Sequence, residues 1–203
     1  MFAAPACAGK SGETKPLKYV ALFRGINVGG KNAVRMADLK RMLEGLGLRG
    51  AATYIQSGNA VFEADADAPA LKAAIEAGFV DRFGFAGVAA IRSADELCAV
   101  VGNLPFTPAE IAAAEAANPE VEHLYVYFLD GPVKRGEAEA LSAGVAGSDR
   151  LRAGEKELYL LCFGSVRDSK PAARVSRAFP SATARNWKTV MKLLELAGGS
   201  TAP

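Results

Sequence analysis

The stretch from Lys18 to Leu46 reads KYVALFRGINVGGKNAVRMADLKRMLEGL, and it joins an apolar segment to an amphipathic one through a glycine-rich loop. Residues 18–23 are almost continuously apolar and are followed by glycine, which is typical of a buried strand. From Met36 to Leu46 the apolar side chains recur at helical spacing, and Gly47 is a good stop signal for a helix. This stretch therefore predicts a strand and a helix that begin the fold.

The elements that follow complete the order β-α-β-β-α-β. Residues 51–55 and 59–63 resemble two short strands around the turn Gln56-Ser57-Gly58. Asp67 can cap a helix whose apolar side chains share one face, and Gly84 lies just past its end. Residues 88–91 form another expected strand. A known arrangement for this order is the ferredoxin-like unit.

Two helices with their own start signals come next. Ser93 with Glu96, and Thr107 with Glu110, match the capping box, in which a hydroxyl and a carboxylate satisfy the first N–H groups of a helix. The second of these helices is alanine-rich, and we expect it to connect two halves of the protein.

The second half repeats the order of the first. It predicts strands over residues 124–129, 149–153 and 157–163, helices over 133–141 and 171–178, a short stretch at 181–184, and a last helix from near Asn186. The fold class predicted is α+β, with two tandem ferredoxin-like halves that have antiparallel sheets and are joined by a helical connector. The expected boundaries are a disordered tail over 1–16, halves over 17–102 and 123–198, a connector over 103–122, and a tail over 199–203.

Composition excludes several classes of protein. The chain has 203 residues, of which 50% are hydrophobic and 23% charged, as in ordinary soluble domains. Its apolar runs fall short of the roughly 20 residues that span a bilayer, and Met1–Pro16 lacks the apolar centre of a signal peptide. We therefore expect a cytoplasmic protein with no membrane partner. Three widely separated cysteines and one histidine, His123, predict no metal site.

The loop after the first strand suits an anion. Gly25, Gly29 and Gly30 allow close approach to the backbone, and Arg24 and Lys31 place positive charge at either end, so phosphate is the expected ligand. The loop also approaches the P-loop pattern of nucleotidases. Asn32, however, stands where that pattern has the hydroxyl that binds magnesium, and the helix starts late. A P-loop-like nucleotidase is therefore a minor alternative.

Three motifs together resemble a known family. LFRGINVGGKN at residues 22–32, followed by MADL at 36–39, resembles the opening of a bacterial family known only as domain of unknown function 1697. YIQSGNAVF at 54–62 and ARNWKTV at 184–190 are similar to its second and C-terminal signatures. The resemblance implies an α+β fold of two ferredoxin-like halves and no established activity. The family usually has Thr where Ala184 stands, and often Asn where Lys188 stands.

The three signatures predict a candidate site, on the hypothesis that they line one polar cleft. Its ligand would be a phosphate-bearing small molecule or a nucleotide, while catalytic residues and cofactors are unknown. The alternative is that asparagines serve turns and caps and that glycines satisfy backbone geometry, which leaves Arg24 and Gln56 without a local role. The candidate ligand-binding residues are Arg24, Gly25, Asn27, Gly29, Gly30, Lys31, Gln56, Ser57, Asn59, Arg185 and Asn186.

Two further hypotheses involve macromolecules. Residues 164–203 carry seven basic and two acidic side chains, and Tyr125, Tyr127 and Tyr159 lie on expected strands, which allows weak RNA binding with aromatic stacking. An oligomeric scaffold without a small ligand is the other hypothesis. The sequence predicts neither an oligomeric state nor whether the protein is an enzyme.

Overall fold

The computed structural model of the chain describes residues 16–29 and 32–199. The predicted tails lie outside these residues, apart from Pro16 and Gly199. The fold is α+β and forms two compact units, each with a four-stranded antiparallel sheet. Unit 1 comprises the residues up to Gly102 and those from Met191 onward, and unit 2 comprises Asn103–Val190. None of the helices in the described ranges is long and apolar enough to cross a membrane.

Unit 1 has the predicted order of elements. These are β1 (Leu17–Arg24), α1 (Met36–Gly45), β2 (Arg49–Tyr54), β3 (Asn59–Ala64), α2 (Ala68–Phe83), β4 (Val88–Ser93) and α3 (Ala94–Gly102). The strand order across the sheet is β2-β3-β1-β4, and every neighbouring pair is antiparallel. At the centre of the sheet, Val20 of β1 lies opposite Val61 of β3 and Arg92 of β4.

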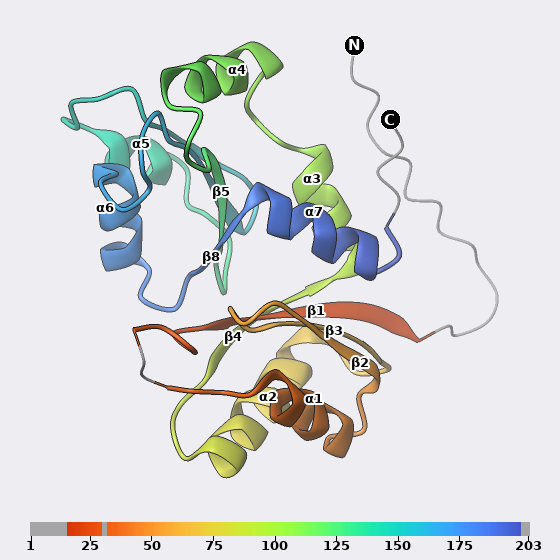
Figure 1. Cartoon of the computed structure of the whole chain (residues 1–203). Helices are drawn as coiled ribbons and strands as arrows, with labels where there is room; N and C mark the ends of the chain where they lie inside the picture. The colour runs from red at the N-terminus through yellow and green to blue at the C-terminus, as the bar shows by residue number, and fades with distance from the viewer. Residues whose placement is uncertain (1–15, 30–31, 200–203) are drawn as a thin grey trace. The chain divides into compact units, whose positions relative to one another are not determined.

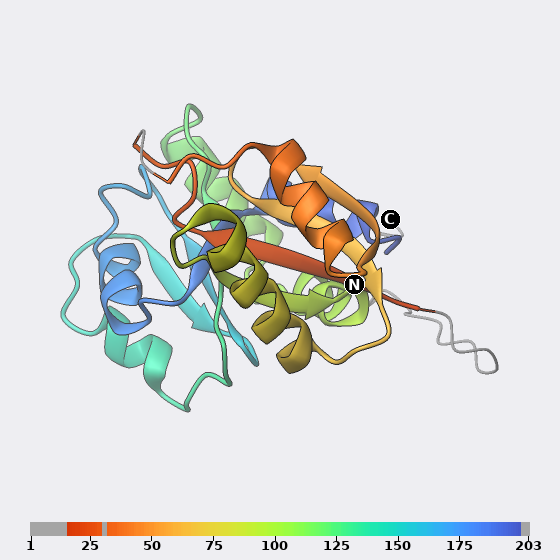
Figure 2. The ribbon, with the colours of Figure 1, turned by 90° about the horizontal axis from the view of Figure 1, so that it is seen from below.

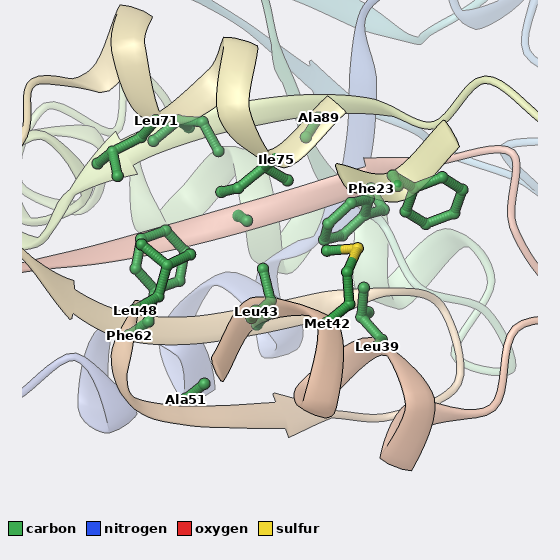
Figure 3. Packing of buried hydrophobic residues seen from close by; sticks show 14 of the residues in the cluster. Phe23, Leu39, Met42, Leu43, Leu48, Ala51, Phe62, Leu71, Ile75 and Ala89 are labelled. Atoms are coloured by element: carbon green, nitrogen blue, oxygen red, sulfur yellow. The ribbon is translucent and has the colours of Figure 1, made fainter. Parts of the chain in front are cut away.

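The core of unit 1 lies between this sheet and two helices. α1 and α2 pack side by side across one face, while α3 contacts β1 and β4 on the other (Figures 1 and 2). Leu43 of α1 and Ile75 of α2 point toward Phe62 and Phe23 of the sheet, and all four are at most 1% exposed (Figure 3). The apolar face that the sequence predicted for each helix is therefore the face that it buries.

Local capping explains where the helices begin and end. The Asp67 carboxylate accepts from the Ala70 N–H at 2.9 Å, and Gly84 ends α2 with φ +76°. Ser93 Oγ accepts from the Glu96 N–H at 3.1 Å, and the Glu96 carboxylate accepts from the Ser93 N–H at 2.9 Å. These contacts confirm the predicted signals, because each satisfies groups that a helix end leaves unpaired.

Unit 2 repeats this pattern after the connector helix. Its elements are α4 (Pro108–Ala117), β5 (Leu124–Phe128), α5 (Glu137–Ser142), β6 (Arg150–Ala153), β7 (Glu157–Leu161), α6 (Lys170–Ala178), β8 (Thr183–Asn186) and the start of α7 (Trp187–Leu196), whose C-terminal part is grouped with unit 1. The strand order is β6-β7-β5-β8, so each strand has a counterpart in unit 1. The predicted repetition of element order is confirmed.

Several predicted boundaries in unit 2 are off by one or two residues, as where β7 ends at Leu161, and two elements differ in a way that affects the site. The helix expected over 133–141 begins at Glu137, because the Val133 N–H donates to the Glu155 carbonyl at 2.8 Å and Gly136 precedes the helix with φ +79°. The short stretch expected at 181–184 is a strand that continues to Asn186 and pairs with β5. Arg185 and Asn186 therefore lie at the end of a strand, where pairing with β5 fixes their backbone.

Candidate functional site

The first two signatures meet in unit 1. We use the name two-loop junction for the place where two segments meet. One is the end of β1 with the loop after it (Arg24–Gly29 and Asn32), and the other is the β2–β3 turn with the first residue of β3 (Ile55–Asn59). The Phe23 N–H, at the end of β1, donates to the Gly58 carbonyl at 2.8 Å. Asn27 Nδ2 donates to the Gln56 carbonyl at 2.8 Å across 29 residues of sequence. The predicted convergence of these two signatures is thus a property of the fold of unit 1.

Asn27 makes the side-chain hydrogen bonds that join the two loops of the junction. Its Nδ2 also donates to the Val34 carbonyl at 2.9 Å, and its Oδ1 accepts from the Val34 N–H at 2.7 Å. The Asn27 N–H donates to the Asn32 carbonyl at 3.0 Å, and Asn32 Nδ2 donates to the Gly25 carbonyl at 3.0 Å. One amide side chain therefore holds both ends of the glycine-rich loop and the neighbouring turn.

Gly58 shows how closely the two loops approach. Its φ is +78°, and a Cβ on it would lie 2.4 Å from Ile26 Cδ1 and 3.0 Å from Phe23 Cβ. Ile26 is only 2% exposed, so it has no solvent space to retreat into. Glycine is required at this position both for its backbone conformation and for the missing side chain.

The asparagines of the signatures have structural partners. Asn59 is fully buried, and its Nδ2 donates to the Tyr54 carbonyl at 3.1 Å and to Ser57 Oγ at 3.0 Å. Together with the contacts of Asn27, this supports the structural interpretation of the asparagines, which had been the alternative to ligand binding. These two amides organise the junction.

The groups that the junction exposes are of a different kind. Gly25, Gly29, Gln56 and Ser57 are exposed, and Arg24 is half-buried at the end of β1. The exposed surface of the junction therefore combines bare backbone, an amide and a hydroxyl, and Arg24 precedes it at the end of β1. Gly30 and Lys31, which the sequence also predicted, lie outside the described residues.

The third signature belongs to unit 2, where its polar side chains have local partners. Arg185 is 9% exposed, its Nη1 donates to the Ala184 carbonyl at 2.8 Å, and burial lowers the pKa of its guanidinium to about 10. Asn186 Oδ1 accepts from the Thr189 N–H at 3.0 Å and so caps α7. A ligand contact by either residue stays a prediction.

Sequence reasoning missed the counterpart of Arg185. Arg92 is 4% exposed and lies opposite Val20 on β1, as Arg185 lies opposite Val126 on β5. Its Nη1 also donates to the carbonyl of the preceding residue, Ile91, at 2.9 Å. The signal was present, because an arginine and a capping residue end the last strand of each half before a helix.

A cavity of about 390 Å³ in unit 2 lies beside the third signature, lined by residues that include Trp187, Lys188 and His123. Lys188 Nζ donates to Glu122 Oε1 at 2.6 Å. His123 is buried, with Nδ1 2.7 Å from the Cys162 carbonyl oxygen and Nε2 2.9 Å from that of Asn118. The single histidine is therefore a structural link between β7 and the end of α4.

The tyrosines of the nucleic-acid hypothesis lie in packed surroundings. Tyr127 is 5% exposed within the core of unit 2, and Tyr125 packs against the same core. Tyr159 is 1% exposed. Tyr127 and Tyr159 therefore expose little ring surface for stacking, while Tyr125 is only partly buried. Nucleic-acid binding stays a prediction.

The described residues include possible metal ligands and two free cysteine thiols. In those ranges no three His, Cys, Asp or Glu side chains are grouped closely enough to hold a metal ion. Cys98 and Cys162 are buried, and burial raises the pKa of the Cys162 thiol to about 12. A thiol so far from ionisation is a poor nucleophile or metal ligand.

Comparison with known proteins gives the family of the chain. The family described as "Protein of unknown function (DUF1697)" matches residues 17–159, a segment that contains the first two signatures but not the third. A solved structure, that of conserved bacterial protein SP0830 from Streptococcus pneumoniae, is similar with a TM-score of 0.69 and 26% identity, over 90% of this chain and 99% of that one. No curated protein matches. The chain belongs to the DUF1697 family of proteins of unknown function.

Proposed function

We propose that the two-loop junction of unit 1 binds a phosphate-bearing small molecule or a nucleotide. The observation that carries the proposal is the hydrogen bond of 2.8 Å from Asn27 Nδ2 to the Gln56 carbonyl, which unites two family signatures in one exposed polar surface. Hydrogen bonds that hold the described parts of the two loops together favour binding, because a ligand need not supply the free energy to order them.

The backbone of the first loop suits an anion. Gly25, Asn27 and Gly29 have φ of +71°, +56° and +59°, while the residues between them are not in that conformation. Residues in this conformation turn the backbone sharply, so that N–H groups of a loop can face an anion. The Asn27 N–H donates to the Asn32 carbonyl. The N–H groups that we propose to bind the anion are therefore those of the residues beside Asn27 in the loop.

The side chains beside this backbone fit a phosphate ester. Arg24, at the end of β1, supplies a guanidinium whose fork of N–H groups matches phosphate oxygens. The exposed Gln56 amide and Ser57 hydroxyl can donate to ester or sugar oxygens. Lys31 contributes to the proposal only through its charge and its place in the sequence.

Calorimetric titration of the full chain with inorganic phosphate, pyrophosphate and nucleoside phosphates tests the proposal. Arg24→Ala is expected to weaken binding by about 10- to 100-fold, because a hydrogen bond to a charged group is lost. Arg41→Ala is the matched control, since Arg41 is an exposed arginine of the same unit paired with Asp38 at 2.6 Å. Equal affinities in the two variants would show that the junction is not the site.

We also infer that each unit is a ferredoxin-like domain. The inference is supported by the strand order β2-β3-β1-β4 and its counterpart β6-β7-β5-β8, with antiparallel neighbours throughout. Helices α1 and α2, and α5 and α6, occupy the positions between strands that this arrangement requires. On this fold the junction lies at the end of the central strand β1.

A further inference from the structure

We propose that the ligand of the two-loop junction carries an apolar or planar group beside its phosphate, and that Val28 and Ile55 bind that group. The inference rests on the proposed function and specifies its ligand as a phosphate ester of an apolar or aromatic moiety. A nucleoside monophosphate is the planar case, and an alkyl phosphate is the flexible case.

The first observation is the position of exposed apolar side chains. Val28 is 66% exposed and Ile55 is 48% exposed. Val28 follows Asn27 and Ile55 precedes Gln56, so the two flank the hydrogen bond that closes the junction. Single exposed hydrophobic residues are ordinary, but two beside one cluster of polar groups provide the mixed surface that small-ligand sites present.

The second observation is backbone strain. Ile55 has φ +49°, a conformation that β-branched residues rarely adopt and that persists only where the surroundings impose it. The non-glycine residues of the described ranges with positive φ are Asn27, Asn32 and Ile55, and all three belong to the junction. Asparagine tolerates this conformation, whereas isoleucine does not, so Ile55 occupies a backbone conformation that its side chain disfavours.

Unit 2 provides an internal comparison. There the Leu129 N–H donates to the Lys156 carbonyl at 2.9 Å, as Phe23 donates to Gly58 in unit 1. The Val133 N–H donates to the Glu155 carbonyl at 2.8 Å, so a backbone group joins loop and turn in unit 2, as the Asn27 side chain does in unit 1. Over the described part of unit 2, no non-glycine residue has positive φ, and the large exposed hydrophobic side chains all lie in unit 1.

Unit 2 therefore joins the corresponding loop and turn without a large exposed hydrophobic side chain and without a strained isoleucine. Both features are therefore specific to the four-residue turn and the loop of unit 1, since the corresponding turn of unit 2 has three residues. Because they stand beside donors suited to phosphate, the geometry points to a ligand that has a polar and an apolar end.

The experiment compares four ligands by calorimetry: AMP, hexyl phosphate, ribose 5-phosphate and inorganic phosphate. Val28→Ser and Ile55→Ser are each expected to lower the affinity for AMP or hexyl phosphate roughly tenfold, because an apolar contact is lost. Affinity for ribose 5-phosphate and inorganic phosphate is expected to stay unchanged. Val80→Ser is the matched control, since Val80 is also 48% exposed but lies on α2. A selective effect on AMP assigns a planar group, and one on hexyl phosphate an alkyl group.

Ile55→Asn separates binding from folding. Asparagine relieves the strain at positive φ, so Tm is expected to rise by about 2–4 °C while AMP binding weakens. A merely structural role for Ile55 would instead lower Tm. If Arg24→Ala abolishes phosphate binding while the Val28 and Ile55 variants bind AMP like the wild type, this inference is overturned and the proposed function stands. If the wild type binds none of these four ligands and neither pyrophosphate nor nucleoside di- or triphosphates, both proposals are overturned.

Discussion

Replacing Gly58 by alanine is expected to destabilise the protein by about 2–5 kcal/mol. The left-handed backbone, with φ +78°, contributes about 1–2 kcal/mol of this for a residue with a Cβ. Overpacking contributes about 1–3 kcal/mol, because the new methyl would lie 2.4 Å from Ile26 Cδ1 and 2.8 Å from Ile26 Cγ1. Phe23, which the methyl also approaches, is 1% exposed and cannot move toward solvent.

Urea unfolding followed by far-ultraviolet circular dichroism measures this change. Gly84→Ala is the matched control, because Gly84 has nearly the same φ, +76°, but no atom within 4 Å of the added Cβ. It is expected to lose only the backbone contribution of about 1–2 kcal/mol. Ile26→Val removes the Cδ1 atom, so adding it to Gly58→Ala is expected to recover part of the loss. Equal losses in the Gly58 and Gly84 variants, or no recovery by Ile26→Val, would refute the close approach of the two loops.

Two further predictions concern charge. Hydrogen bonds from Arg152 and from the Thr107 N–H lower the pKa of Glu110 to about 2, below its unfolded value of 4.5. The stabilisation that ionised Glu110 gives the folded state is therefore complete above pH 4.5 and is lost as pH falls toward 2. The difference in unfolding free energy between the wild type and Glu110→Gln, measured in urea, should shrink over that range. A difference that stays constant would contradict this pKa. Nucleic-acid binding is expected to be weak, because basic side chains such as Arg174 and Lys188 already bind carbonyls or carboxylates within unit 2. Its affinity in anisotropy titrations is expected to fall steeply with salt, because contacts to phosphates release counterions. Tight binding at physiological salt that depends on Tyr125 or Tyr127 would overturn that expectation.

The sequence by itself determined the elements and their order. Strand and helix periods, the caps at Asp67, Ser93 and Thr107, and the glycine after α2 depend on residues a few positions apart, so they can be recognised without the fold. The repetition of the order in two halves followed from the same signals. Family membership also followed from the short signatures, because these are contiguous in the chain.

Contacts between residues distant in the sequence decided the exact bounds of some elements and the burial of some side chains. The helix expected from Val133 starts four residues later because a turn 22 residues away takes the Val133 N–H, and Arg185 lies on a strand because β5 pairs with it. Which face of β5 is covered decided the burial of Tyr127, which alternation alone leaves open.

For the candidate site, the sequence identified the loops but not the role of each side chain. Only the fold brings Asn27 against Gln56 and Gly58 against Ile26, so only the fold separates the residues that build the junction from those that it exposes. The same is true of Ile55, whose strain is invisible in the sequence because φ is set by how the turn meets the neighbouring loop. Local patterns fix secondary structure, while the pairing of strands distant in sequence decides which side chains remain available to a ligand.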